Sequence, residues 1–146
     1  MCPRYSHYSG ENAYTMTHDI LIVDDEPEKS LNLVRFLQSQ GYTVRFARGG
    51  TEALYFIEEK RPDLVICDLE MPDVGGYRVL EAMSTHLGRR DVPFVLANEE
   101  WTPENWSQPA GGRTADCHVS KPYVLEEIGA FVHRVLRYGH EGDASA

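Results

Sequence analysis

Short apolar runs alternate along this chain with longer stretches in which apolar residues recur every three or four positions. The continuous runs are typical of strands buried on both faces, and the spaced pattern is typical of helices with one apolar face. Strands are expected at residues 19–23, 43–47, 64–67, 92–97 and 115–119. Because helical stretches separate these strands, the sheet should be parallel and should carry helices on both faces.

Proline and glycine residues mark the ends of the expected helices. Pro27 suits the first turn of the first helix, where its missing N–H costs nothing, and Gly41 closes that helix. Pro62 stops the second helix at the preceding residue, Arg61. The last amphipathic helix should end at Gly139.

The connection between the fourth and fifth strands breaks this alternation. Residues 98–114 contain two prolines and two adjacent glycines, so at most about two helical turns are expected, near residues 104–108. The fourth helix should therefore be irregular or shortened. A floppy loop and a remodelled contact surface are equally compatible with this composition, and Trp101 and Trp106 favour the surface.

Length and charge narrow the class of protein. The 146 residues suit one domain with a hydrophobic core, here 18–139, between a flexible polar tail at 1–17 and a short polar tail at 140–146. The net charge of −9 opposes binding to nucleic acid or to an anionic membrane, and it is compatible with a cation site. No apolar run approaches the roughly 20 residues that a membrane span needs.

The cysteines and the N-terminus indicate the compartment. The three cysteines lack paired spacing, and Cys67 and Cys117 lie within apolar runs, so both should be buried free thiols. The first residues lack the apolar core of a signal peptide. These features favour the reducing cytoplasm.

Charged residues follow three of the expected strands. Asp24 and Asp25 follow the first strand, Asp68 follows the third, and Lys121 follows the fifth. A lone acid at a strand end commonly caps the next turn, and a lone lysine is commonly solvated. The carboxyl ends of parallel strands share one edge of the sheet, however, so all four residues should lie there. A shared functional site explains this better than four separate coincidences do.

This set of residue types points to phosphoryl chemistry. Three neighbouring carboxylates repel one another and imply a compensating cation, for which Mg²⁺ or Mn²⁺ with oxygen ligands fits best. Lys121 is a point charge suited to a phosphoryl oxygen. An aspartate carboxylate can attack phosphorus and form an aspartyl phosphate.

The motifs resemble one known family. DD after the first strand, D-x-x-M-P-x-x-x-G after the third and K-P after the fifth resemble the receiver domain of two-component response regulators, which is CheY-like. The resemblance covers about residues 19–139. It implies a flavodoxin-like, doubly wound α/β fold with a five-stranded sheet in the order 2-1-3-4-5 and the site at a switch point.

The resemblance also implies a role for each residue of the site. Asp68 matches the phosphoacceptor, Asp25 the direct metal ligand, and Asp24 the acid that holds the metal through water. Glu70 matches the position whose backbone carbonyl completes the metal sphere. Lys121 matches the phosphoryl-binding lysine, and its bond to the following proline is expected to be cis.

Two positions depart from the family pattern. The threonine or serine that usually ends the fourth strand falls on Asn98, or on Ala97 with a slip of one residue. The aromatic residue three positions before the lysine falls on His118. These replacements put the usual switch in question, but they leave the phosphorylation chemistry intact.

Three hypotheses of function follow. The first is a stand-alone receiver, not a conventional enzyme, that catalyses only its own phosphorylation and dephosphorylation. It would receive phosphate from a histidine kinase or a phosphotransfer protein and signal, as a monomer or weak homodimer, to a downstream protein. The second is a pseudo-receiver that binds partners without phosphorylation. The third, a metal-dependent phosphatase, rests on the likeness of Asp68-Leu69-Glu70 to a D-x-D motif, but the general acid and the cap are missing.

Overall fold

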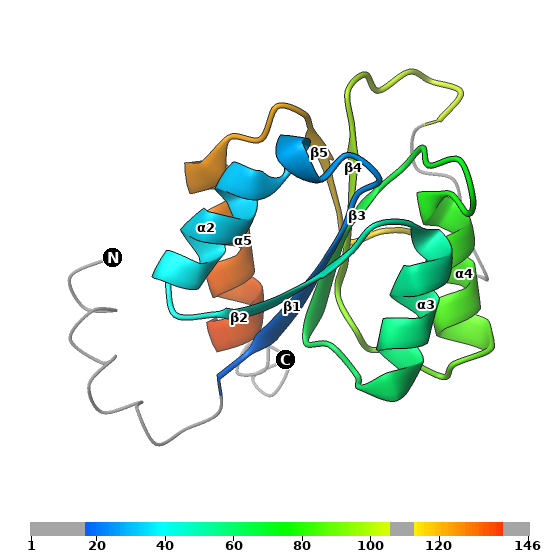
Figure 1. Cartoon of the computed structure of the whole chain (residues 1–146), viewed down its shortest axis with the longest axis horizontal. Coiled ribbons are helices and arrows are strands. Elements are labelled where there is room, and N and C mark those ends of the chain that lie inside the picture. Colours follow the sequence, from blue (N-terminus) through cyan, green and yellow to red (C-terminus); the bar gives the residue numbers. More distant parts are fainter. Residues whose placement is uncertain (1–16, 106–112, 139–146) are drawn as a thin grey trace.

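A parallel sheet of five strands forms the centre of the molecule (Figure 1). The computed structural model describes residues 17–105 and 113–138. The strands lie in the order β2-β1-β3-β4-β5, which confirms the predicted order 2-1-3-4-5. Their bounds are β1 Asp19–Val23, β2 Thr43–Ala47, β3 Leu64–Asp68, β4 Phe94–Asn98 and β5 Cys117–Ser120.

Helices cover both faces of the sheet, as the alternating pattern predicts. A short 3₁₀ turn, η2 (Pro27–Lys29), precedes α2 (Leu31–Ser39), and Pro27 stands in the first turn of η2. The other helices are α3 (Gly50–Glu59), α4 (Gly76–Thr85) and α5 (Leu125–His133), which continues as the π-helical turn η3 (Arg134–Tyr138). Figure 1 shows α2 and α5 on one face and α3 and α4 on the other.

The side chains of β1 alternate between two hydrophobic layers. Leu21 and Val23 belong to the layer under α3 and α4, whereas Ile20 and Ile22 belong to the layer under α2 and α5. Every residue of β1 and β3 is buried. Two-sided burial explains why these strands read as continuous apolar runs in the sequence. It also makes the sheet a rigid base for the loops at its edge.

The last two strands of the chain, β4 and β5, begin later than predicted. β4 begins at Phe94 and not at residue 92, because Pro93 has no N–H to donate to a neighbouring strand. β5 begins at Cys117, two residues later than predicted. Cys67 is fully buried as predicted, but Cys117 is only partly buried, because β5 has a neighbouring strand on one side alone.

Helix α3 is capped by a residue from another loop. Gly49 precedes the helix and has no side chain to cap it, and the Asp73 carboxylate instead accepts hydrogen bonds from the N–H groups of Gly50 and Thr51, at 3.2 and 2.9 Å. A Cβ atom on Gly49 would lie 2.8 Å from an Asp73 oxygen, and one on Gly50 would lie 2.3 Å from the Val74 carbonyl oxygen. The two glycines therefore allow the loop after β3 to pack against the start of α3.

The connection from β4 to β5 is only partly described. Residues 99–105 and 113–116 contain no helix, and the predicted helical turns near residues 104–108, together with Trp106, lie mostly or wholly outside the described residues. The Trp101 indole N–H donates to the Val119 carbonyl of β5 at 2.8 Å. Its ring packs edge-on against His118, with 4.9 Å between ring centroids. Trp101 thus ties the start of this connection to β5.

The predicted tails lie outside the described residues, apart from Thr17. Across the described ranges, we find no helix with the length and apolar character that crossing a membrane requires.

Candidate functional site

Three strands deliver charged side chains to one edge of the sheet. Asp24 and Asp25 directly follow β1, Asp68 is the last residue of β3, and Lys121 directly follows β5. Carboxylate oxygens of the three aspartates lie within 4.8 Å of one another. The structure therefore brings together the four residues that the strand-end pattern selects.

Asp24 is fully buried, and its carboxylate accepts three hydrogen bonds. Oδ1 accepts from the Glu26 N–H at 2.9 Å. Oδ2 accepts from the Ser30 hydroxyl and from the Lys121 ammonium, both at 2.8 Å. Buried carboxylates need such donors, because desolvation penalises the charged form. Asp24 is therefore a fixed anion that orients Lys121.

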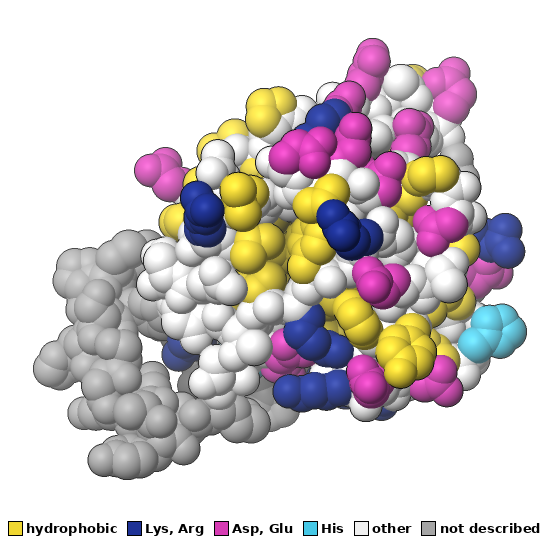
Figure 2. Space-filling view, viewed as in Figure 1, with side chains coloured by type: hydrophobic (Ala, Val, Ile, Leu, Met, Phe, Trp, Pro, Cys, Tyr) yellow, Lys and Arg dark blue, Asp and Glu magenta, His cyan; other side chains and the backbone are white. Residues whose placement is uncertain are grey.

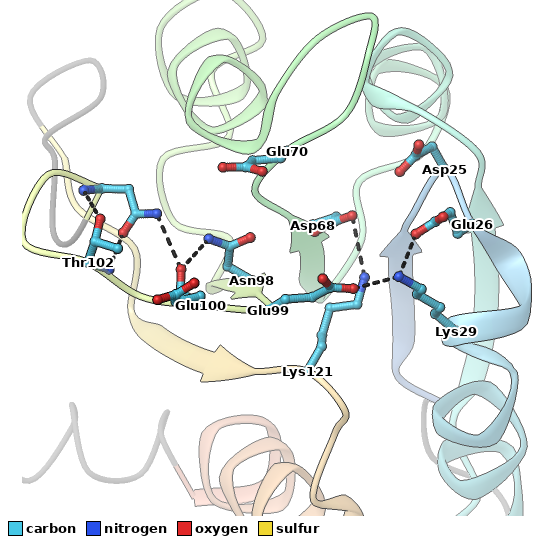
Figure 3. A pocket seen from close by; sticks show the side chains of 11 residues that line it. Asp25, Glu26, Lys29, Asp68, Glu70, Asn98, Glu99, Glu100, Thr102 and Lys121 are labelled. Atoms are coloured by element: carbon cyan, nitrogen blue, oxygen red, sulfur yellow. Dashed lines mark hydrogen bonds and ion pairs between the residues drawn. The ribbon is translucent and has the colours of Figure 1, made fainter.

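Lys121 connects two of the acids. Its Nζ lies 2.8 Å from Asp24 Oδ2. It also lies 3.4 Å from Asp68 Oδ2, and Figure 3 shows this second contact. Burial disfavours the charged ammonium, but the hydrogen bond with Asp24 and the charge of Asp68 outweigh it and raise the pKa of Lys121 above its usual value. The bond from Lys121 to Pro122 is cis, as predicted. The ammonium stays charged beside Asp68.

Asp68 is 7% exposed and keeps one face open to a cleft. Burial raises the pKa of its carboxyl to about 6, the nearby charges of Asp24 and Asp25 add to the rise, and Lys121 opposes it. The raised pKa means that the charged form of Asp68 is less stable here than it is in water, chiefly because the carboxyl is buried. Oxygen ligands of this kind, with one lysine against three carboxylates, fit a hard divalent ion such as Mg²⁺ or Mn²⁺.

The positions that depart from the family pattern have specific contacts. Asn98 ends β4 and is 7% exposed, and its side-chain amide donates to the Glu100 carbonyl at 2.8 Å. The sequence predicts that the hydroxyl of the family pattern is replaced by Asn98, or by Ala97 with a slip of one residue. His118 packs against Trp101, and burial lowers the pKa of its imidazole. The His118 imidazole therefore stays neutral down to a lower pH than an ordinary histidine would.

The edge of the sheet carries a cleft of about 690 Å³ (Figure 3). Six carboxylates and two ammonium groups line it together with polar groups. The lining residues are Asp25, Glu26, Lys29, Asp68, Glu70, Asn98, Glu99, Glu100, Thr102, Asn105 and Lys121. Glu70 lines the cleft and is exposed.

Lys29 and Glu99 form an ion pair beside the mouth of the cleft, and sequence reasoning missed both. The Lys29 ammonium lies 2.5 Å from the Glu99 carboxylate and 2.9 Å from that of Glu26. Their only signal in the sequence is that charged residues follow β1 and β4 closely. Such proximity to a strand end does not say which way a flexible side chain points.

Residues 20–133 match the family model of the response regulator receiver domain. The chain is 33% identical over 122 residues to the response regulator MprA of Mycobacterium ulcerans (strain Agy99), covering 84% of this chain and 51% of MprA. It is 31% identical over 130 residues to the regulatory protein VanRc of Enterococcus gallinarum, covering 86% and 54%. The chain thus spans about half the length of these curated relatives.

Solved structures show the same fold. The chemotaxis protein CheY4 of Vibrio cholerae superposes with a TM-score of 0.75 at 29% identity, covering 83% of this chain and 100% of CheY4. The response regulator TrrA of Thermotoga maritima, solved in complex with Mg²⁺-BeF, superposes with a TM-score of 0.72 at 31% identity, covering 82% and 100%. Together with the family model and the sheet order, these matches establish that the chain belongs to the response regulator receiver domains of two-component systems.

Proposed function

We propose that this receiver accepts a phosphoryl group on Asp68 in a reaction that depends on a divalent cation. The observation that carries the proposal is the meeting of Asp24, Asp25 and Asp68 with Lys121 at one edge of the sheet. Positioning and charge compensation supply most of the catalysis of phosphoryl transfer, and this arrangement offers both.

In the proposed reaction, a carboxylate oxygen of Asp68 attacks the phosphorus of a phosphohistidine. A new P–O bond forms, the P–N bond breaks, and the imidazole nitrogen leaves with the electron pair. Lys121, which Asp24 orients and which lies 3.4 Å from Asp68, would bind an oxygen of the transferred group. A divalent ion held by Asp25 and Asp68, with the Glu70 carbonyl and with Asp24 through water, would supply charge neutralisation. The Asn98 amide would donate to the same group after leaving Glu100.

A second candidate function is favoured by the contacts of Asn98 and Trp101. The Asn98 amide already donates a hydrogen bond to the Glu100 carbonyl, and the Trp101 ring packs against the His118 ring. These contacts favour a receiver whose partner surface works without phosphorylation. In that case Asp68 and Lys121 would keep a structural role.

Intact-protein mass spectrometry distinguishes the two candidates. Incubation with a small phosphodonor and Mg²⁺ should add the mass of one phosphoryl group to the wild type and nothing to Asp68→Asn. Omitting Mg²⁺ should abolish the adduct. An unlabelled wild type, in conditions that label a well-characterised receiver, would support the second candidate.

The partners follow from the same chemistry. The donor would be a histidine kinase or a phosphotransfer protein, and the output would be contact with a downstream protein. The match covers only about half the length of these relatives, so the expected stand-alone organisation stays a prediction.

A further inference from the structure

We propose that Asp73 is a positioning residue for the divalent cation: by capping α3, it holds the loop between β3 and α4 in the path that cation binding needs. This inference rests on the proposed function, of which it uses the cation site at Asp68. The loop comprises residues 69–75 and leads from Asp68 to Gly76, the first residue of α4. It includes Glu70, whose backbone carbonyl is the cation ligand that the family pattern implies.

The two ends of this loop are fixed by backbone contacts. The Leu69 N–H donates to the Ala97 carbonyl of β4 at 2.7 Å, and the Gly76 N–H donates to the Leu69 carbonyl at 2.8 Å. A Cβ atom on Gly76 would lie 2.7 Å from the Asp68 carbonyl oxygen and 2.5 Å from a methyl carbon of Leu96. The chain therefore leaves Asp68 and enters α4 at closely defined places.

The exposed middle of the loop is held by Asp73. Its carboxylate accepts hydrogen bonds from the N–H groups of Gly50 and Thr51 at 3.2 and 2.9 Å, and Figure 1 shows the loop at the same upper end of the molecule as the start of α3. The Val74 carbonyl oxygen lies so close to Gly50 that a Cβ atom there would be 2.3 Å away. Glu70 is three residues from Asp73, which is at most about 11 Å along an extended chain. The cap therefore restricts where the Glu70 carbonyl can lie.

Helix α3 is a firm anchor for the loop because its far end is fixed independently. The Arg45 guanidinium of β2 donates to the carbonyl oxygens of Phe56 and Lys60 at 3.0 and 2.9 Å. It also pairs with the buried Asp19 carboxylate of β1 at 2.6 Å. Ile57, near that end of the helix, is fully buried in the core. Loss of the Asp73 hydrogen bonds should therefore free the loop and leave α3 in place.

The cap and the cation site are coupled through this loop. A loop that is already held in one path binds a cation more tightly than a loop that must first be ordered, because ordering the backbone costs free energy. By linkage, a bound cation strengthens the cap by the same factor by which the cap strengthens cation binding. Since the worth of one N-cap corresponds to a factor of roughly five, Asp73→Ala should weaken Mg²⁺ binding roughly fivefold.

Two matched variants separate the cap from the charge of Asp73. Figure 2 shows acidic side chains gathered over the upper part of the view, where the loops after β1 and β3 lie in Figure 1, so the loss of one carboxylate also changes the local charge. Asp73→Asn removes the charge but keeps a side-chain oxygen that can accept from the N–H groups of α3. Glu52→Ala removes a charge and a hydrogen bond at the start of the same helix, where the Glu52 carboxylate accepts from the Arg48 N–H at 2.7 Å. Both variants should bind Mg²⁺ nearly as tightly as the wild type.

The experiment measures the Mg²⁺ dissociation constants of the wild type and these three variants by NMR titration, without a phosphodonor. Hydrogen exchange of backbone amides provides a second readout. In the wild type, Mg²⁺ should slow exchange of the Gly50 and Thr51 amides by the same roughly fivefold factor and leave the Arg48 amide unchanged. In Asp25→Asn, which loses a cation ligand, Mg²⁺ should slow none of them.

Labelling by a small phosphodonor separates cation binding from the chemical step. Asp73→Ala should need roughly five times more Mg²⁺ to reach its half-maximal labelling rate. At saturating Mg²⁺, its rate should equal that of the wild type, because Asp68 and Lys121 are unchanged.

Equal weakening of Mg²⁺ binding by Asp73→Asn and Asp73→Ala would assign the effect to charge and overturn the proposal. Equal weakening by Glu52→Ala, unchanged affinity in Asp73→Ala, or equal slowing of all three amides would overturn it as well. If Asp73→Ala does not fold, the amide exchange of the wild type decides. A wild type that binds Mg²⁺ but is not labelled would refute the proposed phosphorylation alone, whereas one that binds no Mg²⁺ would also overturn the role of Asp73.

Discussion

Ser30 is the residue whose role is most sharply defined by its contacts. It is fully buried at the start of α2, and its hydroxyl donates at 2.8 Å to the same Asp24 oxygen that Lys121 contacts. Ser30 and Lys121 together hold this oxygen of a buried anion. Ser30 therefore helps to fix the position of the Asp24 carboxylate, which in turn orients Lys121.

Ser30→Ala should lower the free energy of unfolding by about 1–3 kcal/mol, because it leaves a buried carboxylate with one donor fewer. Urea unfolding of the purified protein measures the change. Ser39→Ala is the matched control on the same helix, since the Ser39 hydroxyl lies at the surface and bonds only to the Phe36 carbonyl. Equal destabilisation by the two substitutions would show that the bond to Asp24 is unimportant.

Single residues also show how far the sequence predicts the site. The meeting of Asp24, Asp68 and Lys121 was predictable, because the ends of parallel strands fix where such residues lie. The contacts of Ser30 and Glu99 were not, because they depend on rotamers and on loop paths. Sequence patterns report backbone direction much better than the direction of a long side chain.

Among the elements, α3 depends on the loop that follows β3. Its first N–H groups bond to Asp73, which is 22 or more residues further along the chain. The hydrogen bond from Thr51 is the largest cause that lowers the pKa of Asp73, to about 2. The cap therefore links the start of α3 to the loop that leaves Asp68.

Asp73→Ala should destabilise the protein by about 1 kcal/mol at neutral pH, as expected for a lost N-cap. Because the pKa is depressed in the folded state, the contribution is present above pH 4 and disappears as the pH falls towards 2. The stabilities of the wild type and the variant should therefore converge over that range. A constant difference down to pH 2 would contradict the role of the ionised carboxylate in the cap.

Element boundaries were harder to predict than element types. The sequence pattern identifies all five strands, but it places the start of β5 two residues early. Ala115 is buried although it precedes β5, so apolar character alone does not distinguish a strand from its approach. The cap of α3 was equally hidden, since a glycine before a helix does not reveal a distant carboxylate.

For the molecule as a whole, repulsion among the three aspartates links stability to divalent ions. An ion that binds only the folded state stabilises it by mass action. At ten times its dissociation constant, Mg²⁺ should add about 1.4 kcal/mol and raise the melting temperature by roughly 5 °C. The receiver should therefore be least stable when divalent ions are removed.

Thermal unfolding with EDTA and with increasing Mg²⁺ measures this shift. Asp25→Asn should reduce it strongly, because one ligand is lost. Asp91→Asn should retain the rise in melting temperature. Asp91 is exposed and pairs with Arg61, and it precedes β4, so it lies at the end of the sheet opposite the three aspartates. Equal shifts in the wild type and Asp25→Asn would locate the ion elsewhere.

The contact of Trp101 with β5 bears on whether copies of this protein associate at high concentration. β5 lies at the edge of the sheet, and an open strand edge can recruit a strand from another copy and begin aggregation. The Trp101 indole occupies the Val119 carbonyl and covers part of this edge with a bulky ring. We therefore expect Trp101, at the described start of the connection after β4, to hinder intermolecular β-pairing along β5.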